Sequence, residues 1–424
     1  MVTADCLRAD HCGFLNAEST LTPAIDTLAE DGVSFSQAVA PGPRTPSSVP
    51  VLFTGEFMSD DEDWSMADWQ GRQARIKRHM DRFTHLSERL QQHGYETATF
   101  TTNPWTTRES SFDHGFDDFN EVSADSPDIS SNHLSDSTLF KLVDGNVDLL
   151  PGDPGGWSSK KEWFSQWPGY FELIEDRIDS LSEPFFLWVF ILDSHQPYIT
   201  PRQYRKELSS WSMYYSVMRY WYGKSSDGDI SDRASEMIQG AYRDAVRSVD
   251  GFVTELSAAV EEYDPVTVMF ADHGEALGEH GNFGHEQTLY EENLRIPFFV
   301  HNAGLTATID DQLTIRSLPE LLTDLTTPEK FDPHEHTQQF VFSQTEANQK
   351  QSVRTSRWKL VSSAERTRLF DLKDDPAETT DVSEKYPAVT DSLTDALEAH
   401  RATQEEKGIV SNASADLLAE GRAL

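Results

Sequence analysis

Residues 266–275 read VTVMFADHGE, a mostly apolar stretch that runs directly into an aspartate and a histidine. The composition of residues 266–271 is typical of a buried strand. A helical pattern precedes it, with apolar residues at three- and four-residue spacing over residues 237–256. Strands that alternate with helices favour βαβ units and a parallel sheet. The stretch therefore predicts a buried strand that delivers Asp272 and His273 to one edge of a sheet.

Two further stretches end in the same way. Residues 184–192 (PFFLWVFIL) run into Asp193-Ser-His195, and Met1-Val-Thr-Ala runs into Asp5. Ligands of open parallel sheets bind outside the carboxyl ends of the strands. One aspartate at such a position is usually a helix cap or a turn residue. Three such aspartates, with His285 close behind, predict a divalent metal site instead.

The remaining patterns complete an α/β fold with a mostly parallel central sheet flanked by helices. Thr22 is expected to cap the first helix, because Pro23 suits the first helical position. The opening residues read as the end of a strand, as expected of a chain whose start has been shortened. Helices are expected at residues 22–30, 45–53, 81–93 and 162–182, and a further strand at residues 95–101.

The character of the sequence changes after about residue 335. We therefore divide the chain into an α/β domain (1–335) and a small C-terminal α+β subdomain (336–424). Residues 120–180 of the larger domain are expected to form an insertion, because much of this stretch is polar and aperiodic. The subdomain is expected to contain strands at residues 339–344, 352–361 and 368–372, and a terminal helix at residues 387–404.

The composition excludes several classes of partner. The 424 residues include 35 Lys and Arg against 72 Asp and Glu, a formal net charge of −37. Nucleic acids and anionic membranes carry the same sign, so neither is expected as a partner. Acidic residues spread along the whole chain favour a halophilic, archaeal protein, since high salt screens self-repulsion. A solvated acidic surface is the simpler alternative.

The sequence also indicates a cytoplasmic location. No apolar run approaches the roughly 18–20 residues of a membrane span, and no signal peptide is visible. Two cysteines, Cys6 and Cys12, are too few for a disulfide framework or a zinc knuckle. We expect both to be small, semi-buried thiols.

Residues 45–55 (TPSSVPVLFTG) place the hydroxyl of Thr45 at the start of a short helix. A hydroxyl in this position can cap the helix. It can also act as a nucleophile toward an anion, because the helix dipole and the free backbone N–H groups favour negative charge there. The segment alone leaves both interpretations open.

Together these segments resemble the sulfatase branch of the alkaline phosphatase superfamily. Each motif is moderately specific, whereas their order and spacing are very specific. The resemblance runs from residue 1 to about residue 385 and is weakest over the expected insertion. It is carried by residues 5–11 (DCLRADH), 22–35, 45–55, 193–198 (DSHQPY), 271–281 (ADHGEALGEHG), 284–285, 289–297 (LYEENLRIP), 353–360 and 369–378.

The resemblance implies a set of metal ligands and a nucleophile. Asp5, Asp272 and His273 would hold one divalent ion, and Thr45 would be both the nucleophile and a ligand. A second ion held by Asp193, His195 and His285 is an alternative, although one ion is favoured.

The resemblance also implies residues that contact the substrate. His195 and His285 would bind the anionic ester or protonate its leaving oxygen. Arg8 and Arg44 are candidate contacts for the substrate anion. The alternative for each arginine is a surface or packing role beside nearby acids.

Three positions depart from the family pattern. Sulfatases carry a cysteine or serine at the position of Thr45, and that residue is converted to formylglycine, an aldehyde that threonine cannot give. No formylglycine is therefore expected. Cys6 replaces the second acid of an Asp-Asp pair, and Val49 replaces an arginine. With His273 as a ligand, Mn²⁺, Zn²⁺ or Mg²⁺ is favoured over Ca²⁺.

The implied function is the metal-dependent hydrolysis of an anionic ester. A phosphate or phosphonate ester is favoured over a sulfate ester, because threonine nucleophiles are typical of the superfamily's phosphodiesterases and transferases. The substrate would be a small anionic ester or one linked to a glycan or lipid. One alternative is transfer of a phospho-alcohol group to a glycan or lipid. Another is a degenerate binding protein, which Val49 and Cys6 favour.

Overall fold

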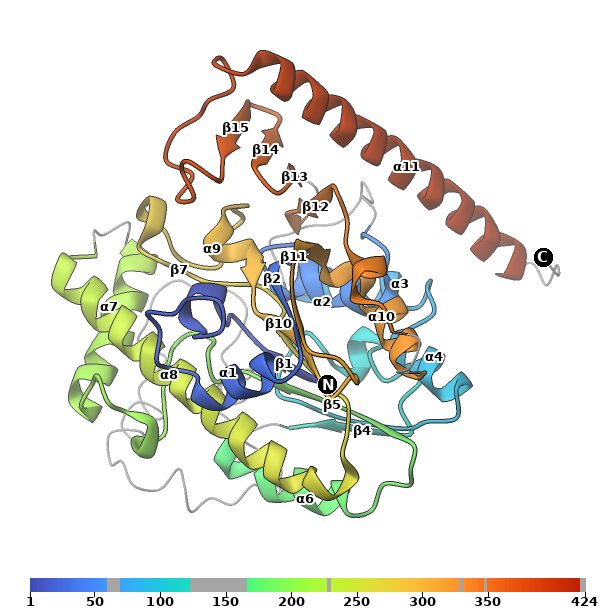
Figure 1. The fold of residues 1–424 in the computed structure, drawn as a ribbon. Helices are drawn as coiled ribbons and strands as arrows, with labels where there is room; N and C mark the ends of the chain where they lie inside the picture. Colours follow the sequence, from blue (N-terminus) through green and yellow to red (C-terminus); the bar gives the residue numbers. More distant parts are fainter. Residues whose placement is uncertain (59–68, 123–165, 227–229, 328–330, 347–348, 420–424) are drawn as a thin grey trace.

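The computed structural model describes residues 1–58, 69–122, 166–226, 230–327, 331–346 and 349–419. A twisted central sheet organises the larger part of the chain (Figure 1). Its strands are, in spatial order, β11 (Ala307–Thr314), β2 (Val33–Val39), β10 (Phe298–His301), β6 (Thr267–Ala271), β1 (Val2–Ala4), β5 (Phe185–Ile191), β3 (Glu96–Thr101) and β4 (Asp118–Glu121), with β9 (Arg295–Ile296) beside β2.

The first strand lies at the centre of this sheet although it has only three residues. It runs parallel to β5 on one side and to β6 on the other, with Thr3 opposite Phe190 and Phe270. Only β9 and β10 run antiparallel to their neighbours in the described sheet. The prediction of a mostly parallel sheet is therefore confirmed. The carboxyl ends of β1, β5 and β6 meet at one edge.

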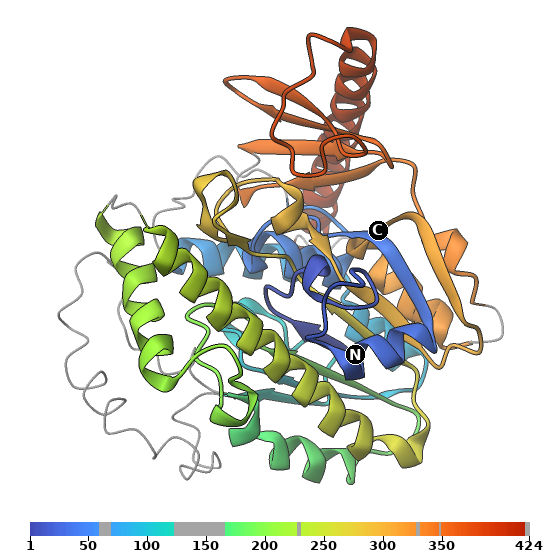
Figure 2. The ribbon, with the colours of Figure 1, turned by 60° about the vertical axis from the view of Figure 1, so that its left-hand side comes forward.

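Helices cover both faces of the sheet (Figure 2). Apolar side chains recur along one side of α8, and Ile238, Val249 and Phe252 are buried against the sheet and its neighbours. One layer contains α1 (Pro23–Glu30), α6 (Phe171–Ile178), α7 (Ser210–Ser226) and α8 (Asp232–Ala259); the other contains α2 (Thr45–Thr54), α3 (Trp69–Met80), α4 (Leu86–Gln92) and α10 (Leu318–Leu325). No described helix has the length and apolarity needed to cross a membrane.

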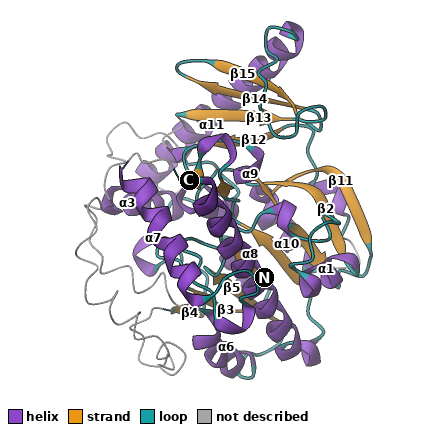
Figure 3. Ribbon diagram, turned by 90° about the vertical axis from the view of Figure 1, so that its left-hand side faces the viewer, coloured by secondary structure: helices purple, strands orange, loops and turns teal. Residues whose placement is uncertain are grey.

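A second, antiparallel sheet stands apart from the first (Figure 3). Helix α11 (Pro387–Ala419) packs Leu393 and Leu397 onto it and then continues past the body of the molecule. The strands of this sheet are β12 (Val341–Gln344), β13 (Lys350–Arg354), β14 (Trp358–Ser363) and β15 (Thr367–Asp371).

Buried charges join the two sheets. Lys359 of β14 is fully buried, and its Nζ lies 3.0 Å from carboxylate oxygens of both Glu291 and Glu378. Glu291 belongs to α9 (Glu291–Leu294), which directly precedes β9 of the central sheet, and Arg354 of β13 also pairs with it at 3.0 Å. The pKa of Glu291 falls well below its usual range because both cations surround it.

Two expected elements have different bounds. The helix expected at residues 81–93 begins only at Leu86, because the side chain of Glu88 accepts a hydrogen bond from the backbone N–H of His85 and fixes the start there. The strand expected at residues 352–361 is a hairpin of β13 and β14. Its turn is closed locally, since Thr355 donates to and accepts from Trp358.

The expected insertion and the helix within it are also revised. Residues 118–121 form β4, which pairs in parallel with β3, and are therefore part of the central sheet. The helix expected at residues 162–182 is limited to α6, because Pro168 and Gly169 lie in a preceding 3₁₀ turn. Residues 123–165 lie outside the described part of the chain. The terminal helix extends to Ala419, beyond the expected end at residue 404.

Helix α1 is capped from a distant part of the chain and not by Thr22. The Thr22 hydroxyl accepts from the backbone of Gly13 and donates to Asp26. Oδ1 of Asp250, on α8, instead accepts the backbone N–H groups of Ala24 and Ile25 at 2.9 and 3.0 Å. Burial raises the pKa of Asp250 to about 6 in spite of these two hydrogen bonds.

Asp250→Asn is expected to stabilise the protein at neutral pH. The folded state binds the Asp250 proton more tightly than the unfolded state, so the carboxylate costs stability as pH rises through the interval from about 4 to 6. Asparagine retains the accepting oxygen without the charge, and we expect a gain of about 1–2 kcal/mol at pH 7.5 that disappears near pH 4. Urea unfolding at both pH values measures it.

Asp250→Ala is the control, because it removes the cap as well as the charge and should therefore be less stable than Asp250→Asn by about 1 kcal/mol at both pH values. An asparagine variant that is less stable at pH 7.5 would show that the attraction between carboxylate and helix dipole outweighs the burial cost.

Candidate active site

The ends of neighbouring strands bring three predicted ligands together. Asp5 follows β1, and Asp272 and His273 follow β6, the strand that pairs with β1. All three side chains are fully buried. His273 Nε2 lies 3.6 Å from Oδ1 of Asp5 and 3.4 Å from Oδ2 of Asp272. These three residues form a group of potential metal ligands.

Thr45 adds a hydroxyl to this group from the first turn of α2. Its Oγ1 lies 3.4 Å from Oδ2 of Asp5 and 3.4 Å from Nε2 of His273. Arg44, not Thr45, occupies the position that precedes the helix. The hydroxyl therefore faces the acidic group, and the cap interpretation does not describe its contacts.

Lone pairs face one another in this group. Nδ1 of His273 lies 2.8 Å from the carbonyl of Gly274, which assigns the ring proton to Nδ1 and leaves a lone pair on Nε2. Burial lowers the pKa of His273 and keeps the ring neutral. Among the residues that the structure describes, Oδ2 of Asp272 is buried without a hydrogen-bond partner, and burial beside Asp5 raises the pKa of Asp272 far above its usual value.

A divalent cation fits this arrangement. Donor atoms at about 2.0–2.1 Å from a tetrahedral ion are separated by about 3.4 Å. Nε2 of His273 lies 3.4–3.6 Å from oxygens of Asp5, Asp272 and Thr45, and Oγ1 of Thr45 lies 3.4 Å from Asp5. Two carboxylates, an imidazole and a hydroxyl suit Mn²⁺, Zn²⁺ or Mg²⁺. A bound cation would pair with the orphaned oxygen of Asp272 and relieve the repulsion between the carboxylates.

Backbone and side-chain donors hold the carboxylates in place. Asn103, which follows β3, donates from Nδ2 to Oδ2 of Asp5 at 2.7 Å. Oδ1 of Asp272 accepts the backbone N–H groups of His273 at 3.0 Å and Cys6 at 3.4 Å. These contacts leave Oδ2 of Asp272 directed toward the imidazole of His273.

The two predicted histidines lie beside the acidic group. The ring centroid of His285 is 4.9 Å from that of His195 and 4.9 Å from that of His273. Nδ1 of His285 is 2.7 Å from Oε2 of Glu275, a fully buried carboxylate that also accepts from the Tyr198 hydroxyl. Burial and the two neighbouring histidines lower the pKa of His285 well below its usual value.

Asp193 does not join His195 and His285. Its Oδ1 accepts from the Ser248 hydroxyl at 2.9 Å and its Oδ2 from the backbone N–H of Trp167 at 3.4 Å. These contacts anchor the end of β5 to α8, and burial raises the pKa of Asp193 to about 7. The alternative second metal group, which requires Asp193, is therefore not formed by these residues.

The two predicted arginines have different surroundings. Arg44 precedes Thr45 and pairs with Glu346 at 3.2 Å, while its buried Nε has no hydrogen-bond partner among the described residues. Its charge also lies close enough to lower the pKa of His285. Arg8 instead donates to Asp10, Glu279 and the carbonyl of Glu275. The surroundings of Arg8 match the packing alternative.

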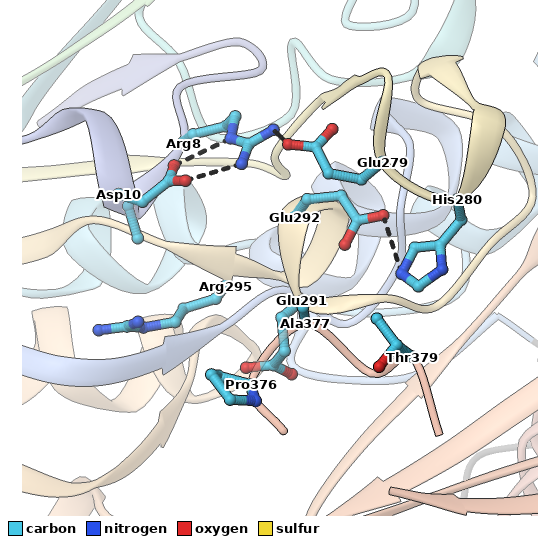
Figure 4. Close-up of a pocket in the computed structure, with 11 residues that line it drawn as sticks. Arg8, Asp10, Glu279, His280, Glu291, Glu292, Arg295, Pro376, Ala377 and Thr379 are labelled. Atoms are coloured by element: carbon cyan, nitrogen blue, oxygen red, sulfur yellow. Dashed lines mark hydrogen bonds and ion pairs between the residues drawn. The ribbon is translucent and has the colours of Figure 1, made fainter. Parts of the chain in front are cut away.

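Arg8 lines a separate cavity of about 510 Å³, which contains none of the metal-ligand candidates (Figure 4). Its guanidinium is held there between Asp10 and Glu279. The opposite wall comes from the C-terminal part of the chain, at Pro376, Ala377 and Thr379. This cavity is distinct from the group around Thr45.

Sequence reasoning missed Asn103, Glu275 and the position of Cys6. Asn103 follows an expected strand, as Asp5 and Asp272 do, so the same pattern would have identified it. Glu275 lies within the quoted stretch but its contact with His285 spans ten residues of irregular chain. The sequence predicts a small, semi-buried thiol at Cys6, whereas its side chain is fully buried and its sulfur lies 3.0 Å from Oδ1 of Asp5.

Comparisons with known proteins show which family the sequence matches. The family model described as Sulfatase matches residues 1–326. The arylsulfatase of Clostridium perfringens is 23% identical over 340 residues, which cover 72% of this chain and 68% of that protein.

Solved structures share the fold. The phosphonate monoester hydrolase of Agrobacterium radiobacter superposes with a TM-score of 0.68 at 18% identity, over 95% of both chains. A protein solved in complex with its substrate D-glucosamine-2-N,6-O-disulfate superposes with a TM-score of 0.65 at 15% identity, over 96% of this chain and 97% of that one.

Asp272→Asn is expected to separate two effects of the buried carboxylate: its cost to the stability of the metal-free protein and its contribution to metal binding. It removes a charge that repels Asp5 and retains the oxygen that accepts from Cys6 and His273. The metal-free variant should therefore melt at a higher temperature than the metal-free wild type. Saturating Mn²⁺ or Zn²⁺ should stabilise the wild type by about 3 kcal/mol at 100 times Kd, and the variant by much less.

Asp193→Asn is the matched control, because Asp193 ends a strand at the same edge and contacts Ser248 instead. Its response to metal should equal that of the wild type. An Asp272→Asn protein that keeps the full metal response in thermal melts would contradict the assignment of the ligand group.

Proposed function

The chain belongs to the sulfatase family and is a sulfatase-like ester hydrolase, and from this premise we propose that Thr45 is its nucleophile. The observation that carries the proposal is the direction of the Thr45 hydroxyl, 3.4 Å from both Asp5 and His273. A hydroxyl among metal-ligand groups at a helix start is placed to attack an anionic ester.

Asp5, Asp272, His273 and Thr45 are the residues that would hold a divalent ion. When bound, such an ion lowers the pKa of a neighbouring hydroxyl and neutralises charge on ester oxygens. Sulfatase-family enzymes use a divalent metal, and the donor set here favours Mn²⁺, Zn²⁺ or Mg²⁺ over Ca²⁺.

The proposed reaction has two steps. Thr45 Oγ1 loses its proton to solvent and bonds to the phosphorus or sulfur, while the bond from that atom to the alcohol oxygen breaks. His195 donates a proton to the departing alcohol and regains one from solvent. Water then cleaves the bond to Thr45 and releases the free anion, with the proton returning to Thr45. His285, whose lowered pKa keeps it neutral and whose Nδ1–H is bound by Glu275, lies beside His195 and presents Nε2 as an acceptor toward the alcohol part of the substrate.

Arg44 is proposed to bind the non-bridging oxygens of the ester. Its buried Nε is an unused donor next to the nucleophile, and its pairing with Glu346 fixes the direction of the guanidinium. The N-terminus of α2 adds a partial positive charge at the same place. Arg8 is not included, because its donors are taken by Asp10, Glu279 and the backbone.

A phosphonate or phosphate ester is proposed as the preferred substrate. Threonine cannot be converted to the formylglycine aldehyde, so the chain lacks the nucleophile with which family members attack sulfate esters. Phosphonate monoester hydrolase and a protein bound to a disulfated glucosamine both share the fold. The alcohol part of the substrate is therefore open to a small molecule or a glycan.

A hydrolysis panel in molar KCl tests the proposal. It compares p-nitrophenyl sulfate, the phosphate monoester, a bis-aryl phosphodiester and an aryl phosphonate, each with Mn²⁺, Zn²⁺ or Ca²⁺. We expect turnover of the phosphonate or diester, and a loss of at least about 1,000-fold in Thr45→Ala. Parallel assays at low salt test the expected salt adaptation.

Ser47→Ala is the control, since Ser47 lies in the same helical turn and its hydroxyl bonds the carbonyl of Arg44. Its rates should stay within a few-fold of the wild type. Undiminished turnover by Thr45→Ala would overturn the nucleophile assignment. Turnover of the sulfate ester alone would leave Thr45 in place and overturn the substrate preference.

A further inference from the structure

We propose that the thiolate of Cys6 is an additional ligand of the metal site, and that it makes the site select Zn²⁺ over Ca²⁺ and Mg²⁺. This inference rests on the proposed function, because it concerns the same ion. It adds a ligand that is not among Asp5, Asp272, His273 and Thr45.

The position of the Cys6 sulfur carries the inference. Sγ lies 3.0 Å from Oδ1 of Asp5, which is itself 3.6 Å from Nε2 of His273. The same sulfur lies 3.8 Å from Nδ1 of His273 and 3.5 Å from Nδ1 of His285, so it is close to both rings on the side of the nitrogens that bond to Gly274 and Glu275, and an ion beside it would be reached by Nε2 of His273. Cys6 thus belongs to two groups of potential ligands, one with His273 and His285 and one with Asp5 and His195.

Cys12 shows how a packing thiol differs. It is also fully buried and free, but its sulfur has the backbone carbonyl of Arg8 as its contact, at 3.6 Å. Cys6 is instead surrounded by one carboxylate and two imidazoles within 4 Å. A thiol that only fills space in an apolar core does not need a carboxylate and two imidazoles around it.

The hydrogen bond between Cys6 and Asp5 already marks a place for a cation. The S–H proton lies between Sγ and Oδ1, two atoms that an ion would share. When the ion binds, the thiol proton leaves to solvent and the sulfur donates an electron pair; nothing is oxidised or reduced. Asp5 and Cys6 need little rearrangement, since donor atoms around such an ion lie about 3.4 Å apart.

A thiolate changes which ion is bound. Sulfur ligands favour Zn²⁺ and other thiophilic ions, whereas Ca²⁺ and Mg²⁺ take oxygen ligands. Without the thiolate, two carboxylates, a hydroxyl and the His273 imidazole would take Mg²⁺ as well as Zn²⁺. One thiolate beside one imidazole is the feature of this chain that discriminates between the two classes.

Co²⁺ is the probe for the thiolate, because a cobalt–thiolate bond gives an intense charge-transfer band in the near ultraviolet. The full-length protein is freed of metal with a chelator in molar KCl and titrated with Co²⁺. The chain has only two cysteines, so in Cys12→Ser any such band arises from Cys6. We expect the band in the wild type and in Cys12→Ser, and its absence in Cys6→Ser.

Direct competition tests the selectivity. We expect Cys6→Ser to bind Zn²⁺ at least about 10-fold more weakly, with its affinity for Mg²⁺ and Ca²⁺ unchanged or higher. Cys12→Ser should match the wild type for every ion. Circular dichroism verifies that each variant is folded, and the Cys12→Ser spectrum decides the question by itself if Cys6→Ser does not fold.

The outcomes distinguish this inference from the proposed function. Visible Co²⁺ bands without the charge-transfer band in Cys12→Ser would mean that the ion binds through oxygen and nitrogen alone, which overturns the role of Cys6 and leaves the metal site intact. A failure of the wild type to bind Co²⁺, Zn²⁺ or Mn²⁺ would overturn the metal site itself.

Discussion

Two buried carboxylates side by side are the constraint on which this structure depends. Asp5 and Asp272 end neighbouring parallel strands, and neither side chain is exposed. Burying two like charges costs several kcal/mol unless protons or a cation compensate. The donors around them are few: the Asn103 amide, the Cys6 thiol and the Thr45 hydroxyl serve Asp5, and backbone N–H groups serve one oxygen of Asp272. Binding of a cation here would therefore be coupled to the folding of this edge.

The sequence predicts those parts of the site whose positions follow from a local sequence pattern. Asp5, Asp272 and His273 each follow a buried strand, and parallel strands bring such residues to one edge. Thr45 can be identified from the sequence because it stands at the start of a predicted helix. The same reasoning fails for Asp193 and His195, two residues apart at the end of β5. One faces α8 and the other faces His285, because the chain turns there.

The parts that the sequence does not predict rest on contacts between distant segments. Asp250 caps a helix 225 residues earlier, which no window over α1 contains. The antiparallel β10 enters the sheet between β2 and β6, and only the tertiary arrangement shows it. Lysine is usually found at the protein surface, yet Lys359 is fully buried between two glutamates. In each case a polar group is satisfied by a partner that the local sequence does not contain.

The acidity of the chain and its proposed anionic substrate are compatible because they act over different distances. Screening shortens electrostatic interactions between exposed charges to about 3 Å at 1 M salt. At that salt concentration the electrostatic field of the exposed charges, which dominate the formal net charge of −37, is weak beyond the first shell of solvent. Interactions between buried groups are screened much less. The ester would be recognised by the groups it touches: Arg44, the start of α2 and the cation between Asp5 and Asp272. Local positive charge, and not the net charge, would thus decide whether the ester binds.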